Sequence, residues 1–148
     1  GGGALALGPR LGKRRYPMLE AAGCTAVLTL LGEAEDVAPI QAEITSRGWT
    51  WIWLPLRGGE PPRPERDVEL QAKLDLAIAT LRAGARLYVH CAAGLHRTGM
   101  IAAALLLQIE GPEVDLVARI HELRPETAAE LRADRVAWAR RISDLARP

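Results

Sequence analysis

The residues with the clearest chemical meaning lie in one short stretch, residues 90–99, with the sequence HCAAGLHRTG. Cys91 becomes a strong nucleophile when its thiol is deprotonated, and Arg97 follows after five intervening residues. The planar guanidinium of an arginine can bind two phosphate oxygens at once, which a lysine cannot do. A cysteine and an arginine at the two ends of a tight loop therefore indicate a site that binds a phosphate group and attacks its phosphorus atom.

The segments on either side of this loop should shape it as an anion-binding site. Residues 86–90 predict a strand, and the alanine- and leucine-rich residues 98–109 predict a buried helix. Gly94 allows a tight turn, and the loop N–H groups can converge on one anion beside the positive end of the helix dipole. The same field favours the thiolate form of Cys91. The loop residues with this expected role are Ala92, Ala93, Gly94, Leu95, His96 and Arg97.

This arrangement suits nucleophilic displacement at phosphorus. The Cys91 thiolate attacks, Arg97 and the loop amides hold the equatorial oxygens, and water hydrolyses the resulting cysteinyl-phosphate. We expect the Thr98 hydroxyl to donate to the Cys91 sulfur and to make it a better leaving group in the second step. We expect His90 to face away from the pocket and to hydrogen-bond the loop backbone, whereas His96 either orients the pocket rim or faces solvent. The sequence has no cluster with metal-ligand spacing, so we expect neither a metal nor another cofactor.

Strand-like and helix-like segments alternate along the chain, which predicts an α/β fold with a largely parallel sheet and helices on both faces. The expected strands cover residues 4–7, 24–31, 49–56 and 86–90, and the expected helices cover 16–22, 33–47, 68–82, 98–109, 113–123 and 127–145. Ligands of such sheets bind beyond the carboxyl ends of the strands, where Cys91 is expected to lie. The 148 residues contain no internal repeat and fit one domain over residues 1–148.

Composition narrows the function classes. The net charge of +1 gives no support for a nucleic-acid or membrane-surface partner, and the apolar runs are too short to span a bilayer. Two cysteines do not form a disulfide framework, and Cys24, inside an apolar strand, is interpreted as structural. The start, GGGALALGPR, lacks a signal-peptide pattern. We therefore expect a cytoplasmic protein, and we expect it to be a monomer.

Two further patterns are interpreted as ordinary structure. Trp49, Trp51 and Trp53 alternate, so they share one face of their strand, and we assign them to packing rather than to a ligand platform. The basic residues of segment 10–15 are interpreted as a solvated turn.

The stretch HCAAGLHRTG resembles the C-x5-R signature of the protein tyrosine phosphatase superfamily, in the form HC-x2-G-x2-R-T-G. The small size and the strand–loop–helix order resemble the dual-specificity branch, including the kinase-associated phosphatases. The resemblance extends to the strand ending at residues 54–56, the Gly-Gly loop and the trailing helices. It implies that Cys91 is the nucleophile, Arg97 the phosphate clamp and Thr98 the hydroxyl that assists the sulfur.

The proton donor of such phosphatases is not at its expected position. Expelling an unprotonated group with a pKa of ~10 is slow, and family members usually supply an Asp in a Pro-x-x-Asp-Gly-Gly stretch. The stretch here is PLRGGE, with Arg57 before the glycine pair. Glu60 is the first replacement, Asp67 the second and Glu65 a third, although Asp67 also suits a helix N-terminus. A loop without any acid is a further alternative, and Arg57 could contact the substrate phosphate or a neighbouring acidic side chain.

The sequence therefore predicts a cysteine-dependent phosphatase that acts on phosphotyrosine in proteins, with phosphoserine and phosphothreonine as further substrates. A chain this short has little room for the loop that deepens the pocket of larger tyrosine-specific relatives. The uncharged loop residues Ala92, Ala93 and Leu95 make a lipid substrate less expected. Three alternatives have different chemistry: an RNA 5′-phosphatase, a non-catalytic phosphoprotein-binding module and a rhodanese-like sulfurtransferase. The near-neutral charge disfavours the first, and the His-Cys start and Arg-Thr-Gly end of the loop disfavour the last.

Overall fold

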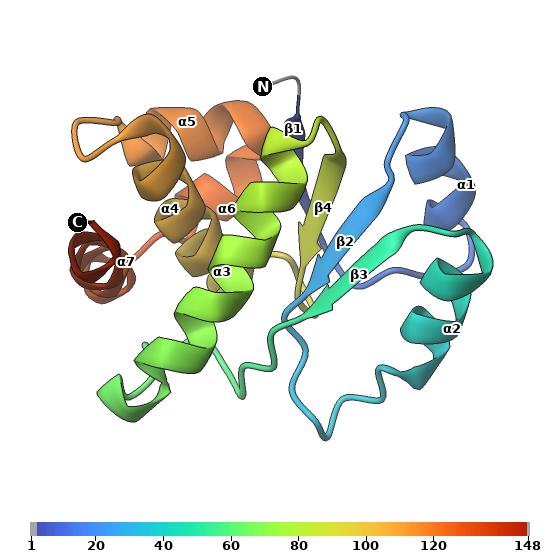
Figure 1. Ribbon diagram of the computed structural model, residues 1–148, viewed down its shortest axis with the longest axis horizontal. Helices are drawn as coiled ribbons and strands as arrows, with labels where there is room; N and C mark the ends of the chain where they lie inside the picture. Colours follow the sequence, from blue (N-terminus) through green and yellow to red (C-terminus); the bar gives the residue numbers. More distant parts are fainter. Residues whose placement is uncertain (1–2, 148) are drawn as a thin grey trace.

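Four parallel strands form the centre of the computed structural model, which describes residues 3–147 (Figure 1). The sheet order is β1-β4-β2-β3, with bounds Ala4–Gly8 for β1, Ala26–Thr29 for β2, Thr50–Trp53 for β3 and Arg86–His90 for β4. His90 pairs in register with Gly8 on one side and Thr29 on the other, so three strands end level with one another. The residue after β4, Cys91, therefore emerges at the carboxyl edge between two neighbouring strand ends. Residues 1, 2 and 148 of the predicted domain lie outside the described part.

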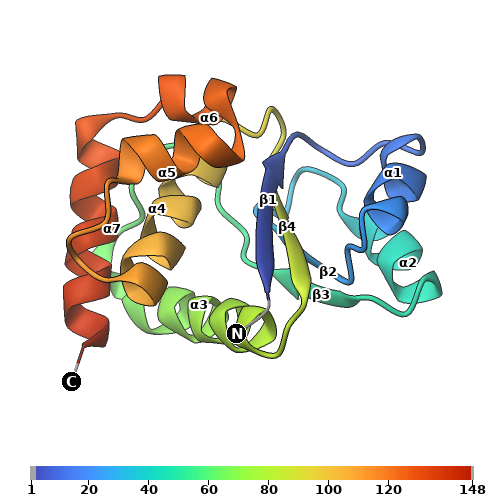
Figure 2. The ribbon, with the colours of Figure 1, turned by 90° about the horizontal axis from the view of Figure 1, so that it is seen from above.

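Helices cover both faces of the sheet, as predicted. Their bounds are Arg15–Ala21 for α1, Ala38–Ser46 for α2, Asp67–Arg82 for α3, His96–Glu110 for α4, Leu116–Leu123 for α5, Pro125–Ala129 for α6 and Ala133–Ala146 for α7, with one 3-10 turn, Pro64–Arg66, before α3. Figure 2 shows α1 and α2 on one face and the other helices on the opposite face. The side chains of β2 point alternately to the two faces of the sheet and are all buried. An apolar core therefore lies on each face.

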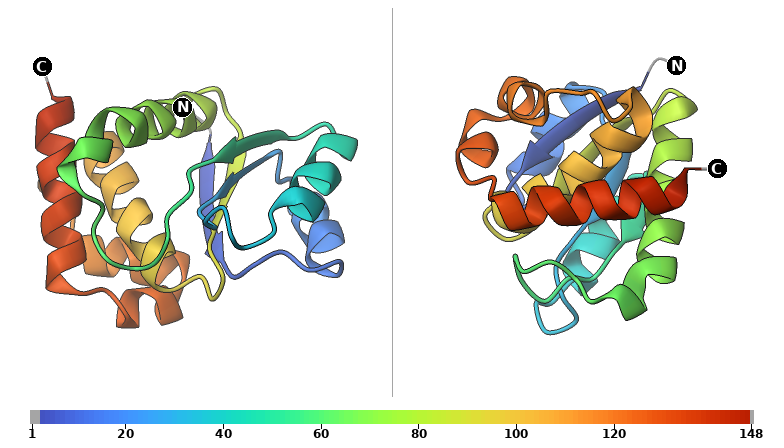
Figure 3. Two further views of the ribbon diagram at one scale, coloured as in Figure 1. Left: turned by 90° about the horizontal axis from the view of Figure 1, so that it is seen from below. Right: turned by 90° about the vertical axis from the view of Figure 1, so that its left-hand side faces the viewer.

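The helix that follows the cysteine loop, α4, is the most deeply buried helix on the face covered by α3 to α7. All residues from Arg97 to Leu107 are buried, because the helix lies between the sheet and α7 (Figure 3). Small side chains at residues 102–104 allow this close packing. A buried helix fixes the position of its own N-terminus, and with it the loop that contains Cys91.

Two predicted helices differ from those in the structure. The helix expected over residues 33–47 begins only at Ala38, because residues 32–36 form a loop whose backbone carbonyls accept hydrogen bonds from Arg10. The helix expected over residues 127–145 is divided into α6 and α7. The break lies at residues 130–132, where the Glu130 carbonyl accepts from the Arg135 side chain. Both regions are held by long-range contacts that a local pattern does not contain, since Arg135 also donates to the Gly59 carbonyl.

No helix in residues 3–147 has the length and apolarity needed to cross a membrane.

Candidate active site

The cysteine loop joins the end of β4 to the start of α4, two residues earlier than the helix expected from the sequence. Cys91 is 3% exposed and therefore lies at the floor of the loop. Gly94 has φ +73°, and a Cβ on this residue would lie 2.4 Å from the carbonyl of Gly8. Only a glycine fits a position that combines this backbone conformation with such close approach. The loop therefore packs directly against the end of β1.

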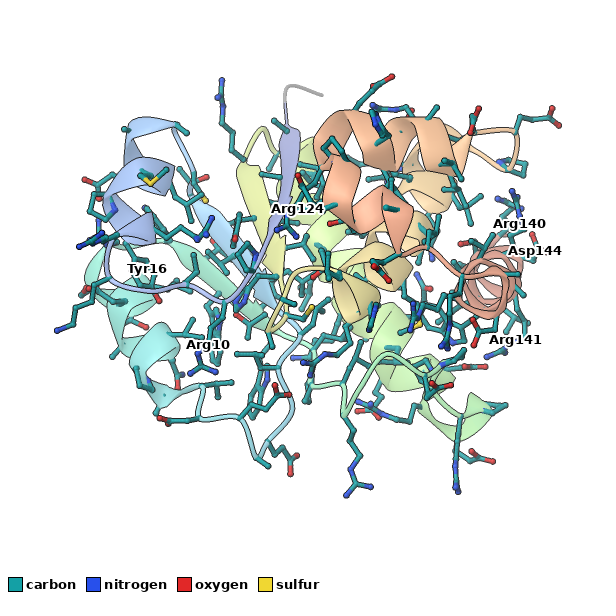
Figure 4. The ribbon with its side chains drawn as sticks, turned by 180° about the vertical axis from the view of Figure 1, so that it is seen from behind. Arg10, Tyr16, Arg124, Arg140, Arg141 and Asp144 are labelled. Atoms are coloured by element: carbon teal, nitrogen blue, oxygen red, sulfur yellow. The ribbon has the colours of Figure 1, made fainter. Side chains whose placement is uncertain are left out.

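The loop is also held from the helical side. The Gly94 carbonyl accepts from the Thr127 hydroxyl at 2.6 Å and from the Arg124 guanidinium at 2.8 Å. Arg124 donates to the Ala93 carbonyl as well, at 3.2 Å. Figure 4 shows Arg124 reaching toward the ends of the strands. These bonds hold the Ala93 and Gly94 carbonyls outside the loop, an arrangement in which the loop N–H groups can face an anion.

The environment of Cys91 favours its thiolate. Burial alone would raise the pKa of this thiol, but other contacts outweigh burial and lower the pKa below its ordinary value. The Thr98 hydroxyl donates to the Cys91 sulfur at 3.1 Å, backbone N–H groups of Thr98 and Gly94 add to this, and the charge of Arg97 acts in the same direction. The structure thus places Thr98 beside the sulfur that it was expected to assist.

Arg97 is fixed by a carboxylate that sequence reasoning missed. Its guanidinium donates to the two Glu35 carboxylate oxygens at 2.5 and 3.1 Å and to the Leu56 carbonyl at 2.8 Å. The hydrogen bond from Arg97 holds the pKa of Glu35 below its usual range, with a smaller contribution from the Gly32 N–H. Glu35 was expected inside the helix over residues 33–47, and its position in a loop is what allows it to reach Arg97.

A second missed residue, Arg10, orders the Glu35 loop. Its guanidinium donates to the Glu35 and Asp36 carbonyls, both at 2.7 Å, and its own backbone N–H donates to the Ala92 carbonyl at 2.9 Å. Figure 4 shows this side chain extending from the segment after β1. The interpretation of segment 10–15 as a solvated turn is therefore wrong for Arg10, although Lys13 is exposed.

His90 lies behind the loop in a buried hydrogen-bonded chain. Its Nδ1 lies 3.1 Å from the Cys91 carbonyl, which can only accept, so Nδ1 carries the proton and Nε2 accepts from the Thr29 hydroxyl at 2.8 Å. The Thr29 oxygen accepts from the Trp51 indole at 2.9 Å. Burial lowers the pKa of His90 to about 4, so the ring is neutral near pH 7. Trp51, one of the three alternating tryptophans, thus supports the cysteine loop through Thr29 and His90.

His96, Glu60 and Asp67 lie at the rim of the site or away from it. His96 is half-exposed, and its Nε2 lies 3.5 Å from a Glu130 carboxylate oxygen. The Glu60 side chain is 80% exposed and lies 3.3 Å from the Arg132 guanidinium. Asp67 is bound by Arg141 at 2.7 and 2.9 Å, and this hydrogen bonding lowers its pKa.

No hydrogen bond connects Glu60 or Asp67 with residues 91–97 within the described chain. Glu65 is exposed in the 3-10 turn. Among residues 3–147, no three or more His, Cys, Asp or Glu side chains are grouped in a way that could hold a metal ion. The structure therefore brings Cys91, Arg97 and Thr98 together and adds Glu35, whereas the expected acids point to other partners.

Comparisons with known proteins agree with this geometry. The family model described as "Polymorphic toxin system, DSP-PTPase phosphatase" matches residues 8–110. No curated protein sequence matches the chain.

Solved structures show a similar fold at low sequence identity. Tk-PTP in the active form has a TM-score of 0.67 and 21% identity, with 97% of this chain and 92% of that chain covered. PTPMT1 in complex with PI(5)P has a TM-score of 0.77 and 18% identity, with coverages of 96% and 91%. The human tyrosine phosphatase-like serine/threonine/tyrosine-interacting protein has a TM-score of 0.69 and 20% identity, with coverages of 96% and 92%. The fold is thus that of the protein tyrosine phosphatases.

Proposed function

Because the chain belongs to the family of dual-specificity-type phosphatases of polymorphic toxin systems, we propose that it hydrolyses phosphotyrosine in proteins through a phosphocysteine at Cys91. The observation that supports this most is the pairing of a thiol whose pKa is lowered with an arginine that Glu35 holds beside it. The family match supports a phosphatase activity. The phosphoprotein substrate and the covalent intermediate are what we propose in addition.

The first step uses Cys91, Arg97 and the loop amides. The thiolate attacks phosphorus in line with the ester oxygen, while Arg97 and the N–H groups neutralise the equatorial oxygens. Glu35 prevents the guanidinium from rotating away, so little reorganisation is needed when the phosphate binds. In the second step water attacks phosphorus and the sulfur departs, and the Thr98 hydroxyl stabilises the returning thiolate.

The loop residues support a phosphoprotein over a phospholipid. Ala92 and Ala93 are exposed and uncharged, so they offer no second cation to a multiply phosphorylated headgroup. The structure of PTPMT1 contains PI(5)P, so a phosphoinositide is the comparison substrate to include. We propose a cytoplasmic enzyme that acts without nucleic acid or membrane partners, as a monomer and without a cofactor.

The test is turnover by the pure, reduced protein of a phosphotyrosine peptide, its phosphoserine counterpart and PI(5)P vesicles. We expect release of phosphate from the phosphotyrosine peptide by wild type and by Cys24→Ser, the matched control, and none by Cys91→Ser. Faster release from PI(5)P would assign the site to lipids instead. Absence of release from every substrate would contradict the proposal.

A non-catalytic phosphoprotein-binding module is the second candidate, favoured by Arg57 at the position expected for the acid. Such a module should bind the phosphotyrosine peptide equally well as wild type and as Cys91→Ser and should leave its phosphate in place. Isothermal titration followed by mass measurement of the recovered peptide separates the two functions.

The family description also suggests a biological setting. We propose that the chain is the phosphatase component of a polymorphic toxin system. Its expression in a bacterial host should slow growth, and Cys91→Ser should not. Equal growth with both forms would contradict a toxic role while leaving the phosphatase assignment in place.

A further inference from the structure

The loop that contains Arg57 packs against the start of α4 and is attached to the protein on both sides of this arginine. Before it, the Leu56 carbonyl accepts from Arg97 at 2.8 Å. After it, the Gly59 carbonyl accepts from Arg135 at 2.7 Å, and a Cβ on Gly59 would lie 2.7 Å from the Cβ of His96. The Arg135 side chain is buried, with 2% of the residue exposed. Arg57 is therefore carried on a short segment whose backbone is attached to Arg97 on one side and to Arg135 on the other.

The Arg57 side chain shares an open space with Glu35, the carboxylate that holds the phosphate clamp Arg97. It is exposed and forms no ion pair with any residue in the described range 3–147. Arg57 and Glu35 line the same cavity of about 650 Å³, and its other charged lining residues are Glu33, Arg66 and Glu69. Arg57 thus lies on the cavity beside the Glu35–Arg97 pair, and no described carboxylate forms an ion pair with it. The group best placed to use it is a bound substrate.

Of the carboxylates that could donate a proton, two are paired with arginines and the third, Glu65, is exposed in the 3-10 turn. Glu60 lies beside Arg132, and Asp67 is bound on both oxygens by Arg141 with its pKa lowered. An arginine stays protonated in proteins, so Arg57 can stabilise an oxyanion through its N–H groups but cannot transfer a proton to it. The leaving oxygen would therefore meet the cation of Arg57 instead of an acid.

We propose that Arg57 binds the departing oxygen of the substrate and that the enzyme is thereby restricted to esters of acidic alcohols, the aryl phosphates. This inference rests on the proposed phosphatase function and names its substrate class. The bond from the Cys91 sulfur to phosphorus forms as the phosphorus–oxygen bond breaks, and the electron pair leaves on a phenolate that takes its proton from water. Water then attacks phosphorus, the sulfur–phosphorus bond breaks, and thiolate and inorganic phosphate are regenerated.

The acidity of the leaving group decides which phosphoproteins qualify. A tyrosine phenol has a pKa of ~10, whereas an aliphatic alcohol is about as weakly acidic as water, with a pKa of ~15.7. If the leaving oxygen is not protonated, most of this difference in pKa adds to the barrier for expelling a serine or threonine alkoxide. The site should therefore cleave phosphotyrosine and leave phosphoserine and phosphothreonine intact, in contrast to the dual specificity that the resemblance implied.

The experiment is single-turnover cleavage of aryl phosphates whose phenols differ in acidity, together with matched phosphotyrosine and phosphoserine peptides. For wild type we expect the rate to fall on the order of tenfold per unit of phenol pKa, and the phosphoserine peptide to react at least ~10³-fold more slowly than phosphotyrosine. Arg57→Ala should slow the least acidic phenol about tenfold more than the most acidic one. Arg57→Lys should restore part of this difference, and Arg63→Ala, which removes an exposed arginine of the same loop, should resemble wild type.

Two results would overturn the inference and leave the phosphatase assignment standing. One is a wild-type rate that does not depend on phenol acidity, which requires an acid. The other is an Arg57→Ala variant that is unchanged or slowed equally with every substrate. If reduced wild type cleaves none of the aryl phosphates, including the most acidic, the proposed function itself fails.

Discussion

Glu35 and Arg97 are 62 positions apart in sequence and form a two-bond ion pair at the edge of the phosphate site. Arg97 is 8% exposed, and its third bond goes to the Leu56 carbonyl. The three bonds use both terminal nitrogens of the guanidinium. Glu35 therefore sets the orientation of the clamp before any phosphate arrives.

Removing the charge of Glu35 should weaken phosphate binding. A hydrogen bond to a charged group contributes about 1.5–3 kcal/mol, so Glu35→Gln should lower kcat/KM for an aryl phosphate roughly 10- to 100-fold. Inhibition by inorganic phosphate should weaken in parallel, because both ligands need the oriented Arg97. Glu33→Gln, an exposed neighbour, is the control and should resemble wild type. Unchanged phosphate inhibition in Glu35→Gln would show that Arg97 does not depend on this carboxylate.

Arg10 should affect catalysis although it lies on a different segment. Arg10→Ala removes both hydrogen bonds to the Glu35 loop, and we expect about a tenfold loss of kcat/KM. Arg10→Lys keeps one nitrogen that can donate to the loop and should recover part of the lost kcat/KM. Because the effect acts through Arg97, phosphate inhibition should weaken in Arg10→Ala but not in Arg14→Ala, which changes an exposed residue. Loss of thermal stability with normal phosphate inhibition would assign Arg10 a purely structural role.

Removing the Thr98 hydroxyl should change the titration of Cys91. The hydroxyl donates to the sulfur and lowers the thiol pKa, so Thr98→Ala should move the pH dependence of Cys91 alkylation by iodoacetamide upward. Thr98→Ser keeps a donor and should stay near wild type. The second step should also slow in Thr98→Ala, which produces a larger burst of phenol. An alkylation profile identical to that of wild type would contradict this role.

His90 should make the protein less stable as the pH falls below 6.5. Its pKa is about 4 in the folded protein and about 6.5 when unfolded, so between these values only the unfolded chain binds the proton. The free energy of unfolding should therefore decrease by about 3 kcal/mol from pH 7 to pH 4 through this group. Urea unfolding of wild type and His90→Asn measures it. The variant should lose less stability over this range, and an equal loss would locate the pH dependence elsewhere.

The sequence was sufficient for the parts of the site that are local in the chain. The apolar run before His90, the glycine in the loop and the buried helix after it are each visible within a few residues, and together they place Cys91 at the carboxyl edge of a parallel sheet. The alternation of strands and helices likewise predicts layers that the structure contains.

The missing parts depend on contacts between distant segments. An acidic residue before a helix is common, so nothing near Glu35 distinguishes a clamp from an ordinary first turn. The break between α6 and α7 contains neither glycine nor proline, and the residues beside it bond to distant segments, Thr127 to Gly94 and Arg135 to Gly59. A pattern read from neighbouring residues cannot contain either pair.

The most direct test of the account is to find the phosphate on the cysteine. Wild type and Thr98→Ala are mixed with an aryl phosphate, quenched in acid within one turnover, digested and examined by mass spectrometry. We predict phosphate on the peptide that contains Cys91, more of it in Thr98→Ala, and none in Cys91→Ser, which should also fail to release phosphate. Steady release of phosphate by Cys91→Ser, or turnover by wild type with no phosphate on this peptide, would contradict the account.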